Sequence, residues 1–364
     1  MSSSRDSTHE IFMLECLSLA ARGAGYVSPN PLVGCVVVKR GRVIGRGFHR
    51  KFGGPHAEVN AIRSARESVR GATLYVNLEP CHVYGKTPPC TDLIIKSGIA
   101  RVVVGMKDPN PLIYGRGIRK LRRAGIRVTV GILKRECRRI NEFFARFVAT
   151  GLPFVTLKIA QSLDGKIGGS KVGWITGRAS RKLVHMLRSR YDAVLVGAGT
   201  VAKDNPRLTV RHIRGRNPVR IVLDGKFRVS ERSAVFRKSA GARTILISDV
   251  IYIRRHAGKS SRLRRKGVEI IELRGRGNGR IPLRTVLTAV GSRGIASILV
   301  EGGASIFSAF LREDLCDKLL VFVAPKVIGK GIAAFAEPPD REIVVHDTAV
   351  MTLENDTLIA GYLH

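Results

Sequence analysis

Three residues that could bind a metal lie close in sequence to a carboxylate that could move a proton. His56 is followed two residues later by Glu58, and Cys81 and Cys90 come after the next expected strand. Imidazole nitrogen and thiolate sulfur are preferred zinc ligands, and a catalytic zinc keeps its fourth position for water. Zinc lowers the pKa of that water, and Glu58 could carry its proton to a leaving amine. The pattern predicts a zinc ion (Zn²⁺) on His56, Cys81 and Cys90, with Glu58 as general acid and base.

Taken one by one, these residues have ordinary explanations. A lone histidine at a helix start is usually a cap or a core residue, and an isolated cysteine usually packs as a small hydrophobe. The combination differs, because His-Ala-Glu followed by Pro-Cys is the signature of zinc deaminases, in which the glutamate is not a ligand. The usual continuation is Cys-x-x-Cys, whereas here eight residues separate Cys81 from Cys90.

That spacing and its surroundings carry a resemblance to a known family. Residues 78–90 (LEPCHVYGKTPPC), residues 28–31 (SPNP), His49 and residues 107–111 (KDPNP) resemble the RibD family of bifunctional riboflavin-biosynthesis proteins. The resemblance extends across nearly the whole chain. It implies a cytidine-deaminase-like domain that hydrolyses the 2-amino group of a diaminopyrimidinone ribosylamino phosphate. A dihydrofolate-reductase-like domain would follow and use NADPH to reduce the opened ribose to ribityl.

The resemblance also assigns substrate contacts to the first half. These positions are Asn30, His49, Lys86, Asp108 and Asn110. Taken without the family, the two asparagines in Pro-Asn-Pro are turn residues and Lys86 is a solvated loop charge. The chain departs from the family after Cys81, where it has His82 and Val83 in place of Ser or Cys followed by His. A family contact is therefore lost or supplied by His82.

The second half opens with residues 158–166 (KIAQSLDGK), which match the start of the family's reductase domain. Residues 300–305 place small side chains between an expected strand and helix, where backbone N–H groups can hold a phosphate. A plain strand-to-helix turn is the alternative. By the resemblance, the NADPH positions are Ala160, Trp174, Thr200, Asp204, Gly303, Ala304 and Ser305, and the substrate positions are Lys158, Arg188, Leu208, Arg211 and Glu301. As simpler alternatives, Trp174 is a core residue and both arginines are surface residues.

A second departure concerns the loop before Trp174. It is two residues shorter than in the family, and Val172 replaces a serine that contacts substrate, although Ser170 or the loop backbone could substitute for it. A deaminase with an inactive reductase half is therefore an alternative reading.

The elements that must position these residues alternate between strands and helices in both halves, which indicates an α/β fold. The segment Thr-Gly-Leu-Pro at 150–153 breaks a helical stretch and marks a domain boundary. We therefore expect a zinc-dependent deaminase domain at 1–150 and an NADPH-dependent reductase domain at 151–364. Residues 7–10 (STHE) match a capping box and predict a helix that begins there.

Charge suggests a rival function. The chain has 63 Lys and Arg against 28 Asp and Glu, a net charge of +35, which would suit a base deaminase fused to an RNA-binding half. The basic clusters are not interleaved with the aromatic residues that stack on single-stranded bases, and the motifs above are not required by an RNA module. We expect a phosphorylated pyrimidine as the small-molecule partner and no specific nucleic acid. Short apolar runs, scattered cysteines and the lack of a secretory signal favour no membrane span, a cytoplasmic location and, from the family, a homo-oligomer.

Overall fold

The chain folds into two compact units, Met1–Gly151 and Leu152–His364, in the computed structural model. The structure describes residues 3–85, 88–169, 173–238, 241–337 and 341–363. Helix α6 (Glu142–Thr150) is capped by Gly151 at the end of the first unit, and β6 begins the second unit at Phe154. The change of unit therefore falls in the Thr-Gly-Leu-Pro segment.

Unit 1 is a sheet covered by helices on both faces. Its described residues form a five-stranded sheet in the order β2-β1-β3-β4-β5. Strand β1 pairs antiparallel with β2 and β3, whereas β3, β4 and β5 run parallel. The strands are β1 (Gly34–Lys39), β2 (Arg42–Phe48), β3 (Thr73–Leu78), β4 (Arg101–Met106) and β5 (Arg127–Val130). Besides α6, the helices are α1 (Ser3–Ala21), α2 (Ala57–Arg63), α3 (Cys90–Lys96), α4 (Arg116–Arg123) and α5 (Lys134–Ile140).

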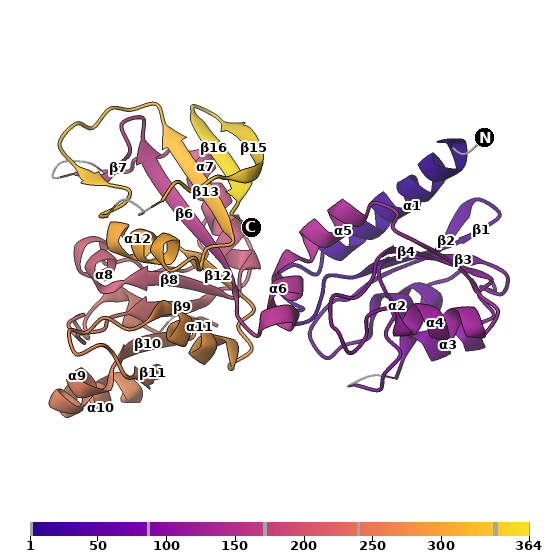
Figure 1. The fold of residues 1–364 in the computed structure, drawn as a ribbon, viewed down its shortest axis with the longest axis horizontal. Helices are drawn as coiled ribbons and strands as arrows, with labels where there is room; N and C mark the ends of the chain where they lie inside the picture. The colour runs from indigo at the N-terminus through magenta and orange to yellow at the C-terminus, as the bar shows by residue number, and fades with distance from the viewer. Residues whose placement is uncertain (1–2, 86–87, 170–172, 239–240, 338–340, 364) are drawn as a thin grey trace. The chain divides into compact units, whose positions relative to one another are not determined.

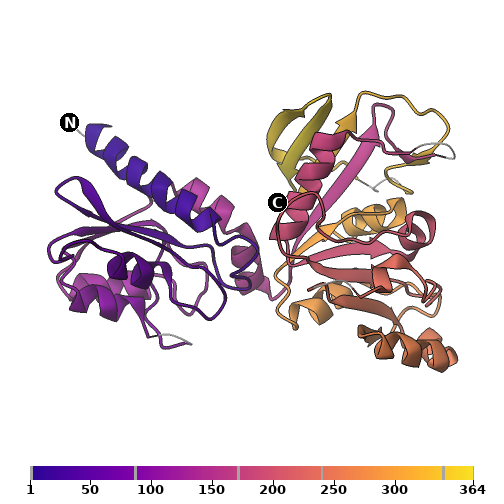
Figure 2. The ribbon, with the colours of Figure 1, turned by 180° about the vertical axis from the view of Figure 1, so that it is seen from behind.

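Alternation along β1 separates two apolar layers in this unit. Cys35 and Val37 belong to a cluster with residues of α2, α3 and α4, whereas Val36 and Val38 belong to a cluster with residues of α1 and α5. Successive side chains of a strand point to opposite faces, so a run of apolar residues builds both layers. Figure 1 shows α1 and α5 on one face of the sheet and α2, α3 and α4 on the other. Figure 2 shows α1 along its face from behind.

The start of α1 differs from the expected one. The helix begins at Ser3, four residues before the predicted capping box, so Ser7 lies inside the helix and the prediction was wrong. Residues 3–6 contain no glycine or proline, and each residue added to an existing helix gains a backbone hydrogen bond at little cost.

Unit 2 is built on a larger sheet. Its described residues form nine strands in the order β11-β10-β9-β8-β12-β6-β13-β16-β15, parallel from β11 to β13 and antiparallel at the β13–β16–β15 edge. The strands are β6 (Phe154–Ser162), β8 (Ala193–Gly197), β9 (Val219–Leu223), β10 (Thr244–Asp249), β11 (Val268–Leu273), β12 (Ser297–Val300), β13 (Lys318–Ala324), β15 (His346–Leu353) and β16 (Asp356–Tyr362), with a separate pair β7 (Lys166–Gly168) and β14 (Ile332–Ala333). The helices are α7 (Arg178–Arg190), α8 (Ala198–Asp204), α9 (Val250–Arg255), α10 (Ala257–Arg265), α11 (Leu283–Gly291) and α12 (Ala304–Arg312), and a 3-10 turn, η1, spans Ala234–Phe236.

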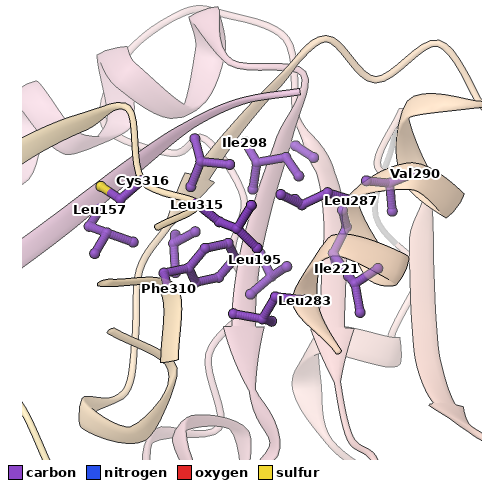
Figure 3. Packing of buried hydrophobic residues seen from close by; sticks show 14 of the residues in the cluster. Leu157, Leu195, Ile221, Leu283, Leu287, Val290, Ile298, Phe310, Leu315 and Cys316 are labelled. Atoms are coloured by element: carbon purple, nitrogen blue, oxygen red, sulfur yellow. The ribbon is translucent and has the colours of Figure 1, made fainter. Parts of the chain in front are cut away.

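The main core of unit 2 lies between the sheet and two helices. Figure 3 shows Leu195, Ile221 and Ile298 of the sheet beside Leu287 of α11 and Phe310 of α12. Full burial of one such side chain contributes about 1.5–3 kcal/mol, so this cluster fixes both helices on the sheet. The N-terminus of α12 is thereby held just after β12.

Parallel strands bring distant segments to one edge of this sheet. Strands β6, β12, β8 and β9 are neighbours and run parallel, so the residues that follow them meet at their common carboxyl edge, where ligands bind in open α/β sheets. No helix in the described ranges is both long and apolar enough to cross a membrane.

Candidate active sites

The structure brings the predicted metal ligands together. His56 precedes α2 as its N-cap, Cys90 is the first residue of α3, and Cys81 follows β3. The Nδ1 atom of His56 lies 3.3 Å from the Sγ atom of Cys90 and 3.5 Å from that of Cys81, and the ligand atoms of all three lie within 4.8 Å of one another. A tetrahedral zinc with bonds of about 2.0 Å to nitrogen and 2.3 Å to sulfur separates such atoms by roughly 3.5 Å. The donor set and its spacing therefore fit zinc.

The two cysteines share a proton unequally. The Cys90 thiol donates to the Cys81 sulfur and, together with the imidazole of His56 and the Cys90 backbone N–H, lowers the pKa of Cys81 to about 4. The same contact and burial raise the pKa of Cys90 well above its ordinary value. Cys81 is thus a ready thiolate, and zinc binding would release the proton of Cys90.

Glu58 is a buried carboxyl beside this cluster. It lies in the first turn of α2 and is 3% exposed. Burial, followed by the negative charge of Cys81, raises the pKa of Glu58 to about 7. A group that exchanges a proton near neutral pH suits general acid and base catalysis.

His49 and Asn30 form a pair next to the ligands. The Nδ1 atom of His49 lies 3.1 Å from the carbonyl oxygen of Pro55, which can only accept, so Nδ1 carries the proton. The Nε2 atom of His49 then accepts from the Asn30 amide at 3.1 Å. Burial lowers the pKa of His49, which keeps the ring neutral. The His49 and His56 rings lie 5.5 Å apart, so this pair borders the predicted metal site.

Asp108 and Asn110 lie in the loop after β4. Asp108 is 5% exposed, and its carboxylate accepts the backbone N–H of Asn110 at 2.8 Å. Burial and the nearby charges of Glu79 and Cys81 raise the pKa of Asp108 to about 6, against the lowering effect of the Asn110 N–H. The Asn110 side chain in turn accepts the N–H of Leu112, so the turn reading and the site reading hold together. Lys86, the remaining predicted contact, lies outside the described residues.

His82 marks one departure from the family. Its side chain is half-buried, and its Nδ1 atom is buried with no hydrogen-bond partner in the described part of the chain. Nothing in the structure explains the His82–Val83 pair.

All the residues predicted for the reductase site line one cleft in unit 2. The cleft has a volume of about 1340 Å³, which exceeds the roughly 300–1,000 Å³ of ordinary ligand pockets and leaves room for a dinucleotide beside a substrate. It contains the predicted cofactor positions Ala160, Trp174, Thr200, Asp204, Gly303, Ala304 and Ser305 and the predicted substrate positions Lys158, Arg188, Leu208, Arg211 and Glu301. Val172 and Ser170, on which the inactive-reductase reading depends, lie outside the described residues.

A backbone cradle at the start of α12 fits a phosphate of the cofactor. A Cβ atom added at Gly303 would lie 3.0 Å from the hydroxyl oxygen of Thr200, so only glycine keeps this approach open. Gly303 is the N-cap of α12, whose first backbone N–H groups have no partner within the helix. Trp174 is 72% exposed, which excludes the core reading, and the Arg181 guanidinium lies 4.9 Å from its ring centre.

Glu301 is the hub of a buried charge cluster. Its carboxylate accepts two hydrogen bonds from Arg188 of α7, at 2.6 and 2.7 Å, and lies 3.4 Å from the ammonium of Lys158 on β6. Burial alone would raise the pKa of Glu301, but the charges of Arg188 and Lys158 lower it to about 2. The surface reading of Arg188 is therefore wrong, since its side chain is 12% exposed.

The neighbouring residues order a second group of donors. The backbone N–H of Arg211 donates to the Nδ1 atom of His185, and the Arg211 guanidinium donates to the Thr209 hydroxyl. Burial and the charges of Arg188, His212 and Arg211 lower the pKa of His185 to about 4, so the ring is neutral at pH 7. Arg211 itself is exposed, and its remaining donors are free to bind an anionic group. Leu208 is buried at 3% exposure.

Two residues in these sites were missed at the sequence level. His185 lies on α7 in an ordinary amphipathic pattern, and nothing in its neighbours signals the cleft. Glu79 precedes Pro80 in a motif already noted, yet its carboxylate binds backbone N–H groups 29 to 39 residues further along the chain. Only the fold brings these partners together.

Known proteins match both units. Residues 6–106 match the model of the cytidine and deoxycytidylate deaminase zinc-binding region, and residues 153–359 match that of the RibD C-terminal domain. The riboflavin biosynthesis protein RibD of Aquifex aeolicus is 46% identical over 327 residues, which cover 88% of each chain.

Two solved structures match nearly the whole chain. One is a diaminohydroxyphosphoribosylaminopyrimidine deaminase/5-amino-6-(5-phosphoribosylamino)uracil reductase from Thermotoga maritima, with a TM-score of 0.85, 42% identity and coverage of 99% of this chain and 100% of that one. RibD of Acinetobacter baumannii has a TM-score of 0.88 at 34% identity and covers 99% of both chains. The protein belongs to the RibD family, and it is a bifunctional riboflavin-biosynthesis enzyme with a zinc-binding deaminase domain and a reductase domain.

Proposed function

We propose that the chain carries out the two reactions named for its Thermotoga relative. Unit 1 would hydrolyse the 2-amino group of a diaminopyrimidinone ribosylamino phosphate, and unit 2 would reduce the ribosyl group of the deaminated product with NADPH. The observation that carries the proposal is that each compact unit holds its own complete constellation, the zinc ligands with Glu58 in one and the reductase cleft in the other.

In the deaminase site, His56, Cys81 and Cys90 would hold the metal. Zinc, when bound, lowers the pKa of a water in its open fourth position. Glu58 accepts a proton from the water and delivers it to the departing amino group, so that the pyrimidine gains a carbonyl oxygen and ammonia leaves. Asn30, His49, Asp108 and Asn110 orient the ring, and the neutral His49 offers no competing positive charge. We also place Lys86 among the substrate contacts.

In the reductase cleft, the residues position two ligands against each other. NADPH supplies the hydride when it is bound, and the protein orients the nicotinamide against the sugar carbon. Backbone N–H groups at Gly303, Ala304 and Ser305 suit its phosphates. Lys158, Arg188 and Glu301 form a rigid polar wall, and Arg211 suits the substrate phosphate because a guanidinium can donate two parallel hydrogen bonds to it.

Mass spectrometry of the diaminopyrimidine ribosylamino phosphate tests both reactions. Zinc-loaded protein without NADPH is expected to give the deaminated product alone, and added NADPH is expected to add two hydrogens. Protein stripped of metal by a chelator should lose deamination and still reduce the deaminated compound, because the zinc ligands and the cleft belong to different units. Deamination without reduction would contradict the reductase half of the proposal. No conversion, together with salt-dependent RNA affinity, would favour the nucleic-acid reading instead.

The order of strands also indicates where the two ends of NADPH lie. With phosphates at the start of α12 and the nicotinamide near Lys158 on β6, the adenosine end extends across β8 to the end of β9. Lys226 and Arg228 follow β9 there, and Arg280 lies on a loop that contacts theirs. All three are exposed and line the cleft, and none has an acidic partner among the described residues. They suit the 2′-phosphate that distinguishes NADPH from NADH.

A double substitution tests this cofactor preference. Lys226→Ala with Arg228→Ala is expected to weaken NADPH binding by about tenfold or more, since charge-assisted hydrogen bonds are worth about 1.5–3 kcal/mol each. NADH affinity should stay the same, and so should NADPH affinity in the control Arg255→Ala on α9, outside the cleft. Calorimetric titration of each variant measures these affinities. A wild-type protein that binds both cofactors equally would contradict the assignment.

We further propose a cytoplasmic location and a homo-oligomer. All six cysteines are free, which agrees with a reducing compartment. Strand β15 ends the large sheet with Val350 and Met351 exposed at 70% and 55%, a surface that a second copy could cover.

A further inference from the structure

Glu79 holds a loop of unit 1 through its side chain alone. It is 3% exposed at the end of β3. Its Oε2 atom accepts the backbone N–H groups of Asp108 at 3.2 Å and Gly115 at 2.9 Å, and its Oε1 atom accepts that of Ile118 at 3.2 Å. An ionised carboxylate is an acceptor at both oxygens, so it satisfies all three donors at once. These donors span the loop from the end of β4 to the first turn of α4.

The loop that Glu79 holds carries two of the proposed substrate contacts. The Asp108 carboxylate accepts the Asn110 N–H at 2.8 Å, and Asn110 accepts the Leu112 N–H at 3.0 Å. Glu79 is therefore the first member of a chain of contacts that runs through Asp108 to Asn110. A shift of the Glu79 carboxylate would move both.

The other side of Glu79 is tied to the metal ligands. Pro80 and Cys81 follow it directly, and its own N–H donates to the Met106 carbonyl at 2.9 Å. A Cβ atom at Gly117 would lie 2.1 Å from the Pro80 carbonyl oxygen, so the first turn of α4 is pressed against the segment that leads to Cys81. Substrate loop and ligand segment thus meet at one buried carboxylate.

We propose that Glu79 is a positioning residue that fixes the substrate loop 107–118 against the Pro80–Cys81 segment. In this way it sets where Asp108 and Asn110 hold the pyrimidine relative to Cys81 and Glu58. The inference rests on the proposed deaminase function for its kinetic consequence, whereas the anchoring of the loop stands on the contacts alone.

Glu79→Gln tests the role with little change in size. The amide offers one acceptor oxygen and turns N–H groups toward a backbone N–H, so at least one of the three hydrogen bonds is lost. We expect KM for the deaminase substrate to rise about tenfold or more, kcat to change by less than about threefold, and the zinc content per chain to stay the same. Leu121→Ala is the matched control, because it weakens the packing of α4 in the same core and leaves the three N–H donors in place. It should leave KM unchanged.

A double-mutant cycle separates positioning from general weakening. In an Asp108→Asn background, Glu79→Gln should raise KM by much less than it does alone, because its effect passes through Asp108. Independent, multiplicative effects, a loss of zinc in Glu79→Gln, or an equal rise of KM in Leu121→Ala would each overturn the proposal.

Hydrogen exchange gives a readout that needs no substrate. Amides of residues 107–118 should exchange faster in Glu79→Gln, while those of strand β3 keep their protection. Unchanged exchange in the loop would overturn the anchoring role. Faster exchange in a wild-type background that binds zinc without deaminating would instead reject the proposed function and retain the anchor.

Discussion

Glu58→Gln is expected to lower kcat for deamination by about 10²–10⁴-fold while the zinc content stays at the wild-type level. The carboxyl moves protons and is not among the three clustered ligand residues. An amide of the same size cannot exchange a proton near neutral pH. Metal analysis and steady-state kinetics on the same preparation measure both quantities.

Two comparisons make this result specific. His56→Ala should lose zinc together with deamination, and reduction of the deaminated compound should be unchanged in both variants because the cleft lies in unit 2. A Glu58→Gln protein that loses zinc as completely as His56→Ala would show that Glu58 holds the metal.

The pH dependence of stability gives the same residue a second readout. Burial raises the pKa of Glu58 from 4.5 to about 7, so its ionised form is the penalised one. Its contribution to the free energy of unfolding is complete below about pH 4.5 and is lost as pH rises through 7. In chelated protein, Glu58→Gln should therefore gain up to about 3 kcal/mol relative to wild type between pH 4.5 and 8. Urea unfolding at several pH values measures this difference, and a gain toward acid pH would reverse the assigned sign.

The zinc site could be predicted from sequence because its geometry is local. His56 and Glu58 are two residues apart at the start of one helix, and Cys90 opens the next, so the chain itself supplies the orientation. Glu79 could not be assigned in this way, because its partners lie on a loop and a helix that reach it only after β3 and β4 have paired. Local spacing carries ligands, whereas tertiary contacts carry their supports.

The same distinction explains the elements that the sequence did not predict. Helices α9 and α10 are dense in arginine and lysine and bury little beyond Ile253 and Leu263, so they show no apolar period. Strand β15 is exposed along nearly its whole length and lacks the alternation of a half-buried strand. Hydrophobic patterning reports burial, and elements with little burial at the margin of a sheet escape it.

Removal of the Glu301 carboxylate is expected to have the largest effect on stability in unit 2. Arg188 and Lys158 are each 12% exposed and share this one anion, so Glu301→Ala leaves two positive charges buried with no counter-charge. Loss of one partner of a buried ion pair costs about 3–5 kcal/mol. Reduction should fall sharply as well, because both cations line the cleft.

Hydrogen exchange followed by mass spectrometry localises this loss. Peptides of unit 2 should lose protection in Glu301→Ala, and those of unit 1 should keep it together with deamination. Arg243→Ala is the matched control, since its partner Glu269 sits in an exposed pair with the arginine 65% exposed, and such pairs are worth about 0–1 kcal/mol. Equal destabilisation by the two variants would contradict the role of burial.

The sign of the pH dependence provides the final check on this cluster. The pKa of Glu301 is held at about 2, below its ordinary 4.5, so the ionised form is the stabilised one. Its contribution is present above about pH 4.5 and is lost as pH falls toward 2. In the Glu301→Ala protein, Arg188→Met should restore part of the lost stability, because it removes one of the two uncompensated charges while it keeps apolar volume. Further destabilisation by Arg188→Met would show that packing around α7, and not the unpaired charge, accounts for the loss.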